Sequence, residues 1–192
     1  VTSIYRQQAE NKSGNRHWDR WFMMAFVGFA VGFIAFTLRV FIDLITSLKF
    51  ELAQSVLKQS LFKSFLVIFG FGGMLSLIGT VIVIYIRPSA ASSGMPQLIG
   101  FLNGTHLQHI FDWKTLMIKY LSCICAVSSG LPCGAEAPLI HMASLVGASI
   151  TRLGQRICGL NLTWLDRFRS SKDRRIFISA GAAAGIASAF GA

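Results

Sequence analysis

The stretch SFLVIFGFGGMLSLIGTVIVIYI, residues 64–86, decides the fold class of this chain. It contains no Asp, Glu, Lys or Arg over 23 residues, and about 20 apolar residues suffice to cross the hydrocarbon core of a bilayer. One charged side chain at the centre of such a helix typically adds about 2.5 to 3.5 kcal/mol to the free energy of insertion. The stretch therefore predicts a membrane-spanning helix.

A second apolar run lies before it. Residues 22–38 can form another span, and residues 40–48 extend this run past Arg39 and Asp43. These two charged residues are four positions apart. On a helix they can therefore form an ion pair, or Arg39 can extend its charged end to the interface. The sequence predicts a tilted helix here, followed by a loop over residues 54–63.

The composition places the whole chain in a membrane. Hydrophobic residues make up 53% of the chain and charged residues only 14%, with a mean hydropathy of +0.57. Soluble domains have about 25% charged residues. We therefore expect an all-α integral membrane protein that crosses the bilayer several times. Residues 1–17 form a polar N-terminal lead, and the membrane domain occupies residues 18–192.

Four later apolar segments are shorter than, or barely as long as, a bilayer crossing. They are residues 96–102, 115–130, 138–150 and 176–190. Short, tilted or re-entrant helices would explain these lengths. The last segment consists mostly of small residues, and Gly181 and Gly185 are spaced for close contact with another helix. It is therefore expected to lie deep inside a helical bundle.

The net charge of +10 does not indicate nucleic-acid binding, because the basic residues cluster in polar connections. They lie before the first span, directly after the second, and in a later connection over residues 152–175. If these regions share one side, the positive-inside rule makes that side cytoplasmic. Lys49, Lys58 and Lys63, in the loop between the two spans, weaken this bias without reversing it. The expected partners of the basic surface are anionic membrane lipids.

Two short interruptions carry the functional signal. Ser92-Ser93-Gly94-Met95-Pro96 and Gly134-Ala135-Glu136-Ala137-Pro138 each stand immediately before an apolar, helix-like run. A Pro just inside a helix start leaves the backbone N–H groups before it unpaired, and the helix dipole adds partial positive charge there. Anions bind at such helix ends, and transporters place them near the bilayer midplane. The pattern predicts a site for a small anion inside the membrane.

At the first interruption, the Ser93 hydroxyl and the backbone of Gly94 and Met95 can replace part of the water shell of an anion. Neutral dipoles bind an anion reversibly, whereas a full positive charge in the same place would hold chloride too tightly. The alternative is an ordinary helix start, in which Ser92 or Ser93 caps the helix and Pro96 lies in its first turn.

At the second interruption, Glu136 places a carboxylate at a helix start in apolar surroundings, flanked by the backbone of Gly134, Ala135 and Ala137. Intramembrane acids are functional candidates. The ionised carboxylate would occupy the anion pocket itself, and the protonated side chain would leave it, so Glu136 would be both gate and proton carrier. The alternative is a Glu that only complements the helix dipole. His141 is expected to be a packed, hydrogen-bonded histidine.

Enzyme chemistry has no basis in the sequence. There is no set of nucleophile, base and orienting residue, no phosphate-binding glycine loop and no metal-ligand cluster. The four cysteines are expected to be free thiols. We therefore expect no catalytic residue, no metal and no cofactor, with chloride as the bound ion.

Together these residues resemble the CLC family of chloride channels and chloride/proton exchangers, and more closely its intracellular endosomal and lysosomal branch. Ser93-Gly94-Met95-Pro96, followed by Phe101-Leu102-Asn103-Gly104, resembles the family's Gly-Ser-Gly-Ile-Pro-Glu block with its downstream Leu-Asn-Gly. Residues 134–144 resemble Gly-Lys-Glu-Gly-Pro-x-x-His-x-x-Ser. Residues 173–192 resemble the Ser-Ala-Gly-Ala-Ala-Ala-Gly segment of the family.

The resemblance implies that Ser93 coordinates chloride and that Glu136 is the external gating glutamate. It implies a homodimer with a separate pore in each subunit, located in an intracellular membrane. Its fold would be an inverted repeat of two halves, of which this chain supplies the first, without the second. Whether the protein is a gated channel or a chloride/proton exchanger is left open.

Four residues depart from the family blocks: Ser92 replaces Gly, Gln97 replaces Glu, Ala135 replaces Lys or Arg, and Ala137 replaces Gly. Loss of the cation beside Glu136 would weaken the attraction for anions, and a methyl group at Ala137 would restrict the backbone. These changes favour an alternative, in which the chain is a degenerate, non-conducting structural subunit of a larger membrane complex.

Overall fold

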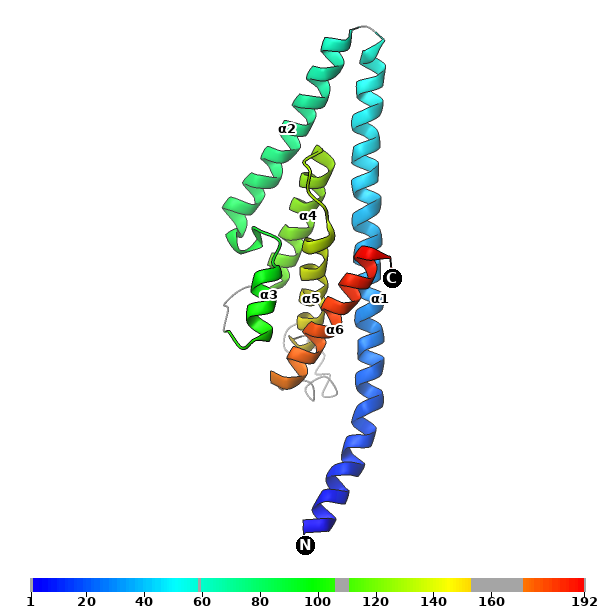
Figure 1. Ribbon diagram of the computed structural model, residues 1–192, viewed down its shortest axis with the longest axis vertical. Helices are drawn as coiled ribbons and strands as arrows, with labels where there is room; N and C mark the ends of the chain where they lie inside the picture. The colour runs from blue at the N-terminus through cyan, green and yellow to red at the C-terminus, as the bar shows by residue number, and fades with distance from the viewer. Residues whose placement is uncertain (1, 59, 106–110, 153–170, 192) are drawn as a thin grey trace, which may run out of the picture.

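The computed structural model describes residues 2–58, 60–105, 111–152 and 171–191, and all regular structure in these ranges is helical (Figure 1). The predicted all-α architecture is confirmed. The elements, in chain order, are α1 (Thr2–Leu57), α2 (Leu61–Ile86), the short 3-10 helix η1 (Pro88–Ala90), α3 (Met95–Leu102), α4 (Trp113–Ser129), α5 (Glu136–Arg152) and α6 (Ser171–Phe190).

Two of these helices are long and apolar enough to cross a membrane. They are the part Arg20–Leu57 of α1, with a mean hydropathy of 2.2, and the whole of α2, with a mean hydropathy of 2.4. The two helices form a hairpin that extends beyond the shorter helices (Figure 1). Their large apolar side chains point outward: Phe29 is 75% exposed and Phe69 is 70% exposed. Such a surface is suited to contact with lipid.

The predicted loop over residues 54–63 is wrong for most of its length, because α1 continues to Leu57 and α2 begins at Leu61. Lys49, which was expected in this loop, lies within α1 and is only 4% exposed. Its Nζ donates a hydrogen bond to the carbonyl oxygen of Ser128 at 2.9 Å. The ammonium therefore satisfies a carbonyl at the C-terminal end of α4, where the helix dipole also favours a cation.

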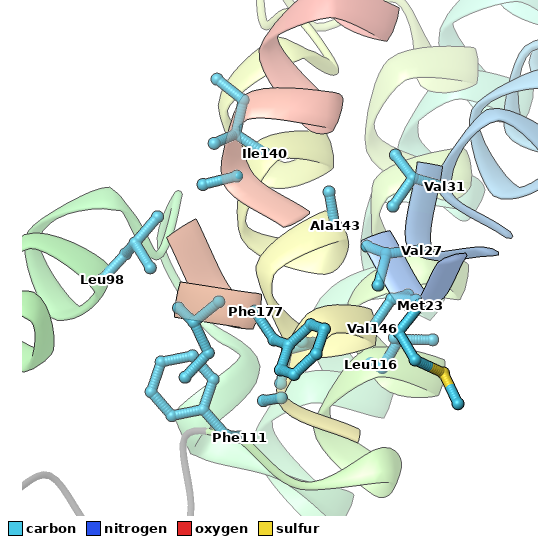
Figure 2. Close-up of a cluster of buried hydrophobic side chains, with 14 residues drawn as sticks. Met23, Val27, Val31, Leu98, Phe111, Leu116, Ile140, Ala143, Val146 and Phe177 are labelled. Carbon is cyan, nitrogen blue, oxygen red and sulfur yellow. The ribbon is translucent and has the colours of Figure 1, made fainter. Parts of the chain in front are cut away.

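The short apolar segments form helices α3, α4, α5 and α6, as predicted. Helix α5 lies at the centre of the bundle, and residues 139–148 are all buried. Side chains from α1, α3, α4 and α6 converge on it (Figure 2). The labelled members of this cluster are Met23, Val27, Val31, Leu98, Phe111, Leu116, Ile140, Ala143, Val146 and Phe177.

Helices α5 and α6 approach each other through small residues. A Cβ at Gly181 would overlap the carbonyl oxygen of Ala143, and a Cβ at Gly147 would overlap that of Phe177. Gly185 lies equally close, because its Cβ would be 2.7 Å from the Cβ of Ala143. The predicted Gly-xxx-Gly contact is confirmed. It occupies one face of α6 only, because Ile186 on another face is 46% exposed.

An ion pair fixes α6 against α1 at the other end of the bundle. Arg20 Nη2 donates to Asp173 Oδ1 at 2.7 Å, and Asp173 is 7% exposed. Most of the predicted basic connection, residues 152–175, falls on residues 153–170, which lie outside the described residues. The ion pair shows how one end of this connection is positioned.

We expect Gly181→Ala to lower the free energy of unfolding by about 1–3 kcal/mol, because overpacking a core that cannot shift forces helices apart. The methyl group would meet backbone of the buried helix α5 rather than a flexible side chain. The measurement is thermal unfolding of the purified protein in detergent. Gly73→Ala is the matched control, since nothing lies within 4 Å of its Cβ. Equal stability of the two variants would contradict the packing analysis.

Candidate functional site

Helix α3 begins at the first predicted interruption. Gly94 caps the helix in the left-handed region with φ of 82°, and the helix opens with Met95 and Pro96. The Ser93 hydroxyl oxygen accepts a hydrogen bond from the backbone N–H of Met95 at 3.4 Å. Ser93 therefore lies at the helix start and engages one of its free amide groups. The alternative, a helix capped by Ser92 or Ser93, is wrong in the capping residue, because Gly94 holds the N-cap position; the anion-binding role of Ser93 stays a prediction.

Ser92 also has a positive φ, of 67°, the only such value at a non-glycine position in the described residues. The left-handed region costs a residue with a Cβ roughly 1–2 kcal/mol, which explains why the resemblance expects glycine here. The Ser92 hydroxyl accepts a hydrogen bond from Gln97 Nε2 at 3.3 Å. Two of the departures from the family blocks, Ser92 and Gln97, are thus in contact with each other.

Gly94 packs against two buried polar side chains. A Cβ at this position would overlap the imidazole of His141 on α5 and would lie 2.8 Å from Nζ of Lys119 on α4. Glycine is therefore required here both by its φ and by this close approach. The contact brings the start of α3 onto α4 and α5.

Lys119 and His141 are bonded to each other beneath this turn. Lys119 Nζ lies 2.8 Å from His141 Nδ1, and the two residues are 2% and 1% exposed. A protonated ammonium has donors only, so Nδ1 accepts and the imidazole carries its proton on Nε2. Nε2 is buried and has no hydrogen-bond partner among the described residues. The expectation that His141 is packed and hydrogen-bonded is confirmed.

No carboxylate of the described residues lies within ion-pair distance of Lys119. The ion pairs among the described residues join Arg20 to Asp173 and Arg87 to Asp112. A buried ammonium is costly unless it is compensated. Here the compensation within the described structure is a neutral imidazole, which leaves the positive charge available to a further anionic partner.

The second interruption ends the connection between α4 and α5. Glu136 is the first residue of α5, and the N–H of Leu139 donates to the carbonyl of Ala135 at 2.9 Å. The Glu136 side chain folds back over Gly134, because a Cβ at Gly134 would overlap its carboxylate. Glu136 is exposed in the described structure.

Two cavities share Gly134 and Val127 in their walls. The first, which we call the lysine cavity, has a volume of about 400 Å³ and is lined by Ser92, Lys119, Gly134 and Pro138, among others. The second, the glutamate cavity, has a volume of about 510 Å³. It is lined by Gly134, Ala135 and Glu136 together with residues from α1 and the end of α6. Gly134 therefore forms part of the wall of both cavities.

The structure brings some of the predicted site residues together and separates others. Gly94 contacts the buried pair on α4 and α5, and Gly134 lines both cavities. Ser93 lines neither cavity, and Glu136 lines only the glutamate cavity. The remaining predicted residues, Met95, Ala135 and Ala137, are partly buried. A single anion site that includes both Ser93 and Glu136 stays a prediction.

The sequence analysis missed Lys119. It treated residues 115–130 as one apolar segment, although a lysine stands inside this segment. A charged residue in an otherwise apolar helix is the signal that could have identified it. Its partner could not be inferred, because His141 is 22 positions away on another helix.

We expect the Lys119–His141 hydrogen bond to show energetic coupling. Lys119→Met and His141→Leu should each lower the free energy of unfolding by about 1–3 kcal/mol, because each leaves a buried polar group unpaired. The double variant should lose less than the sum of the two. Thermal unfolding of all four proteins measures this, with Lys114→Met, at an exposed position of α4, as the control. Strictly additive losses would contradict the coupling.

Comparison with known proteins identifies the family. The family model described as "Voltage gated chloride channel" matches residues 73–192, more than half of the chain. The chain belongs to the CLC chloride channel family. The matched region contains both interruptions, the Lys119–His141 pair and the contact between α5 and α6.

Individual CLC proteins are similar to this chain along most of its length. The similarity to "Chloride channel protein D" of Dictyostelium discoideum is 39% identity over 173 residues, which is 90% of this chain and 17% of that protein. The human "H(+)/Cl(-) exchange transporter 7" is 35% identical over 178 residues, 90% of this chain and 22% of that protein. The chain thus spans about a fifth of the length of these relatives.

The fold is also found among solved structures. The structure titled "Crystal Structure of a eukaryotic CLC transporter" matches with a TM-score of 0.75 and 23% identity. The match covers 88% of this chain and 30% of that chain. The predicted CLC-type helical fold is confirmed by this similarity.

Proposed function

We propose that the protein to which this chain contributes transports chloride, or another small monovalent anion, across a membrane. Membership of the CLC family supports this function. The observation that carries it is the start of α3 packed on Lys119, a buried ammonium with no carboxylate of the described residues within ion-pair distance. A helix start and a buried cation at one place favour an anionic ligand.

In this proposal the anion binds at the start of α3, near Ser93, Gly94 and Met95. Amide and hydroxyl dipoles replace part of the water shell of the anion. Lys119 lies behind Gly94, and its positive charge attracts the anion without forming a direct bond to it. Because His141 holds the ammonium at 2.8 Å, the cation is fixed in position. Such a site binds an anion and still releases it.

Glu136 acts as the gate, with Gly134, Ala135 and Ala137 as its backbone surroundings. Its carboxylate lies over Gly134, which lines both cavities together with Val127. An ionised Glu136 carboxylate occupies the region of positive potential at this boundary and excludes the anion. A protonated, neutral Glu136 does not compete with the anion. Proton binding and anion passage are thereby linked, in a gated channel or in chloride/proton exchange.

The remaining assignments follow from the family. We propose a transporter or channel rather than an enzyme, without a cofactor, acting as a homodimer or in a larger membrane complex. Its partners are chloride, membrane lipids and, in an exchanger, protons. Similarity to an exchange transporter supports the exchanger, and we propose an intracellular, endosomal or lysosomal type of membrane as its location.

A second candidate function is a structural, non-conducting subunit. The strained φ of Ser92 and the alanines at positions 135 and 137 favour it. Chloride flux from proteoliposomes that contain the natural polypeptide bearing this chain distinguishes the two functions. Flux above that of empty liposomes supports transport, and its absence supports the structural role.

We expect Glu136→Gln to remove the pH dependence of chloride flux and to uncouple it from proton movement, because the amide cannot change its protonation state. Chloride and proton fluxes in proteoliposomes measure this. Glu51→Gln, at an exposed position of α1, is the control and should behave like the unsubstituted protein. Unchanged pH dependence in Glu136→Gln would refute the gating role.

We expect Ser93→Ala to change the selectivity between chloride and nitrate, because the Ser93 hydroxyl engages the Met95 N–H at the start of α3. A change of about 0.5–1.5 kcal/mol, the usual net contribution of one hydrogen bond, corresponds to roughly a two- to tenfold shift in relative flux. Ser55→Ala, at an exposed position of α1 outside both cavities, is the control. Identical chloride and nitrate fluxes before and after the Ser93 substitution would exclude this role.

A further inference from the structure

The C-terminal end of α4 lies between the two helices of the apolar hairpin (Figure 1). On the α2 side, a Cβ at Gly72 would lie 2.6 Å from the carbonyl oxygen of Ser129. On the α1 side, Lys49 Nζ donates a hydrogen bond to the carbonyl oxygen of Ser128 at 2.9 Å. Two neighbouring carbonyls at the end of α4 are therefore each in contact with one helix of the hairpin.

The helix itself does not supply a donor for the Ser128 carbonyl. In a continuing α-helix the donor would be the N–H four residues later, but that residue is Pro132, which has no N–H. Gly130, with φ of 95°, turns the chain out of the helix, and its own N–H donates to the carbonyl of Val127. In this buried place the donor comes from another element, because Lys49 of α1 provides it.

The position of Lys49 is costly for a charge. It lies within the apolar part Arg20–Leu57 of α1, about 12 Å from Leu57 along the helix axis at about 1.5 Å per residue. A lysine side chain can extend toward an interface, but this one is 4% exposed and is bonded to α4. Neither ion pair among the described residues includes it. Since an apolar side chain would avoid the cost of burying a charge, the carbonyl that it satisfies is the reason for a lysine here.

The connection from α4 to α5 carries the effect of this bond toward the candidate gate. The connection is short, Pro132 fixes one of its φ angles, and the N–H of Cys133 donates to the carbonyl of Leu131 at 2.7 Å. Helix α5 fixes the backbone of Glu136, its first residue, but the Glu136 carboxylate lies over Gly134, which belongs to the connection. A displacement of the end of α4 would therefore move the surface on which this carboxylate lies.

We propose that Lys49 is a positioning residue for the gate. Its ammonium holds the end of α4 in place, and with it the connection that supports the Glu136 carboxylate. Lys49 acts through this connection and does not contact the anion. The inference rests on the proposed function for the gating role of Glu136, whereas the anchoring of the connection is independent of transport.

The first measurement is hydrogen exchange of backbone amides, read by mass spectrometry, in the natural polypeptide that contains this chain. Lys49→Met keeps the length of the side chain without a donor. It should speed exchange in residues 126–135 at least about fivefold, as expected when one buried group is left unpaired. Lys49→Arg keeps a charged donor and should exchange like the unsubstituted protein.

Ser64→Ala is the matched control for the loss of a buried hydrogen bond. The Ser64 hydroxyl donates to the carbonyl of Ala53 at 2.9 Å and thereby joins α2 to α1, at the same hairpin but not to α4. Ser64→Ala should leave exchange in residues 126–135 unchanged. Lys49→Gln, with a neutral donor on a shorter side chain, is the second variant in case Lys49→Met does not fold, and it should show a smaller change of the same sign.

The second measurement is chloride flux from proteoliposomes at one fixed pH. Lys49→Met should raise the flux about two- to tenfold, the effect of one hydrogen bond, because a displaced gate blocks the anion less completely. In the Glu136→Gln background, where the gate is already removed, Lys49→Met should leave the flux unchanged. General damage to the fold would lower the flux in both backgrounds, so the comparison separates a positioning role from a merely structural one.

Two results would overturn the proposal. One is equal exchange in residues 126–135 of Lys49→Met and the unsubstituted protein, and the other is an equal effect of Lys49→Met on flux with and without Glu136. An unsubstituted protein that carries no chloride flux contradicts the proposed function instead. In that case the exchange measurement still decides whether Lys49 holds the connection, because it requires no transport.

Discussion

A buried ammonium must find a partner, and this constraint organises the centre of the molecule. Lys119 on α4 is almost inaccessible and donates to His141 on α5 at 2.8 Å. Gly94 lies directly on this pair and forces the chain into a left-handed turn from which α3 begins. The helix start that the sequence marked with Pro96 is thus held over a positive charge. The proposed anion site depends on this arrangement of three helices.

Close helix packing makes the arrangement possible. Helices α5 and α6 approach until backbone meets backbone at Gly147 and Gly181, and this contact places α5 in the core with all of residues 139–148 buried. The buried face of α5 carries His141, while its first turn carries Glu136 at the boundary of two cavities. One helix therefore connects the buried cation to the candidate gate. The small residues of α6 thereby determine where α5, with His141 and Glu136, lies in the bundle.

The helices and their apolar character could be predicted from the sequence, because hydrophobic segment length and Pro and Gly positions act locally. The Gly-xxx-Gly contact of α6 was predicted for the same reason. Lys49 shows the limit of this approach. It was expected in a loop because charged residues usually end an apolar run, but the carbonyl of Ser128, 79 positions away, allows the helix to continue through it. Arg39 and Asp43 were interpreted as a local ion pair or as an Arg39 that extends to the interface, and only the tertiary structure shows that they line a cavity with Glu136.

The sequence by itself determined that this chain is a helical membrane protein of CLC type and which helix starts and side chains are the candidates for anion chemistry. These properties follow from composition, from local motifs and from their order along the chain. Only the tertiary structure decided that Gly94 lies on Lys119 and His141, that Ser93 and Glu136 do not line a common cavity in the described structure, and that Arg39 and Glu136 line the same cavity. The reason is physical: the partners of buried charges come from distant helices, and side-chain packing, which has no local signature, decides which of them meet.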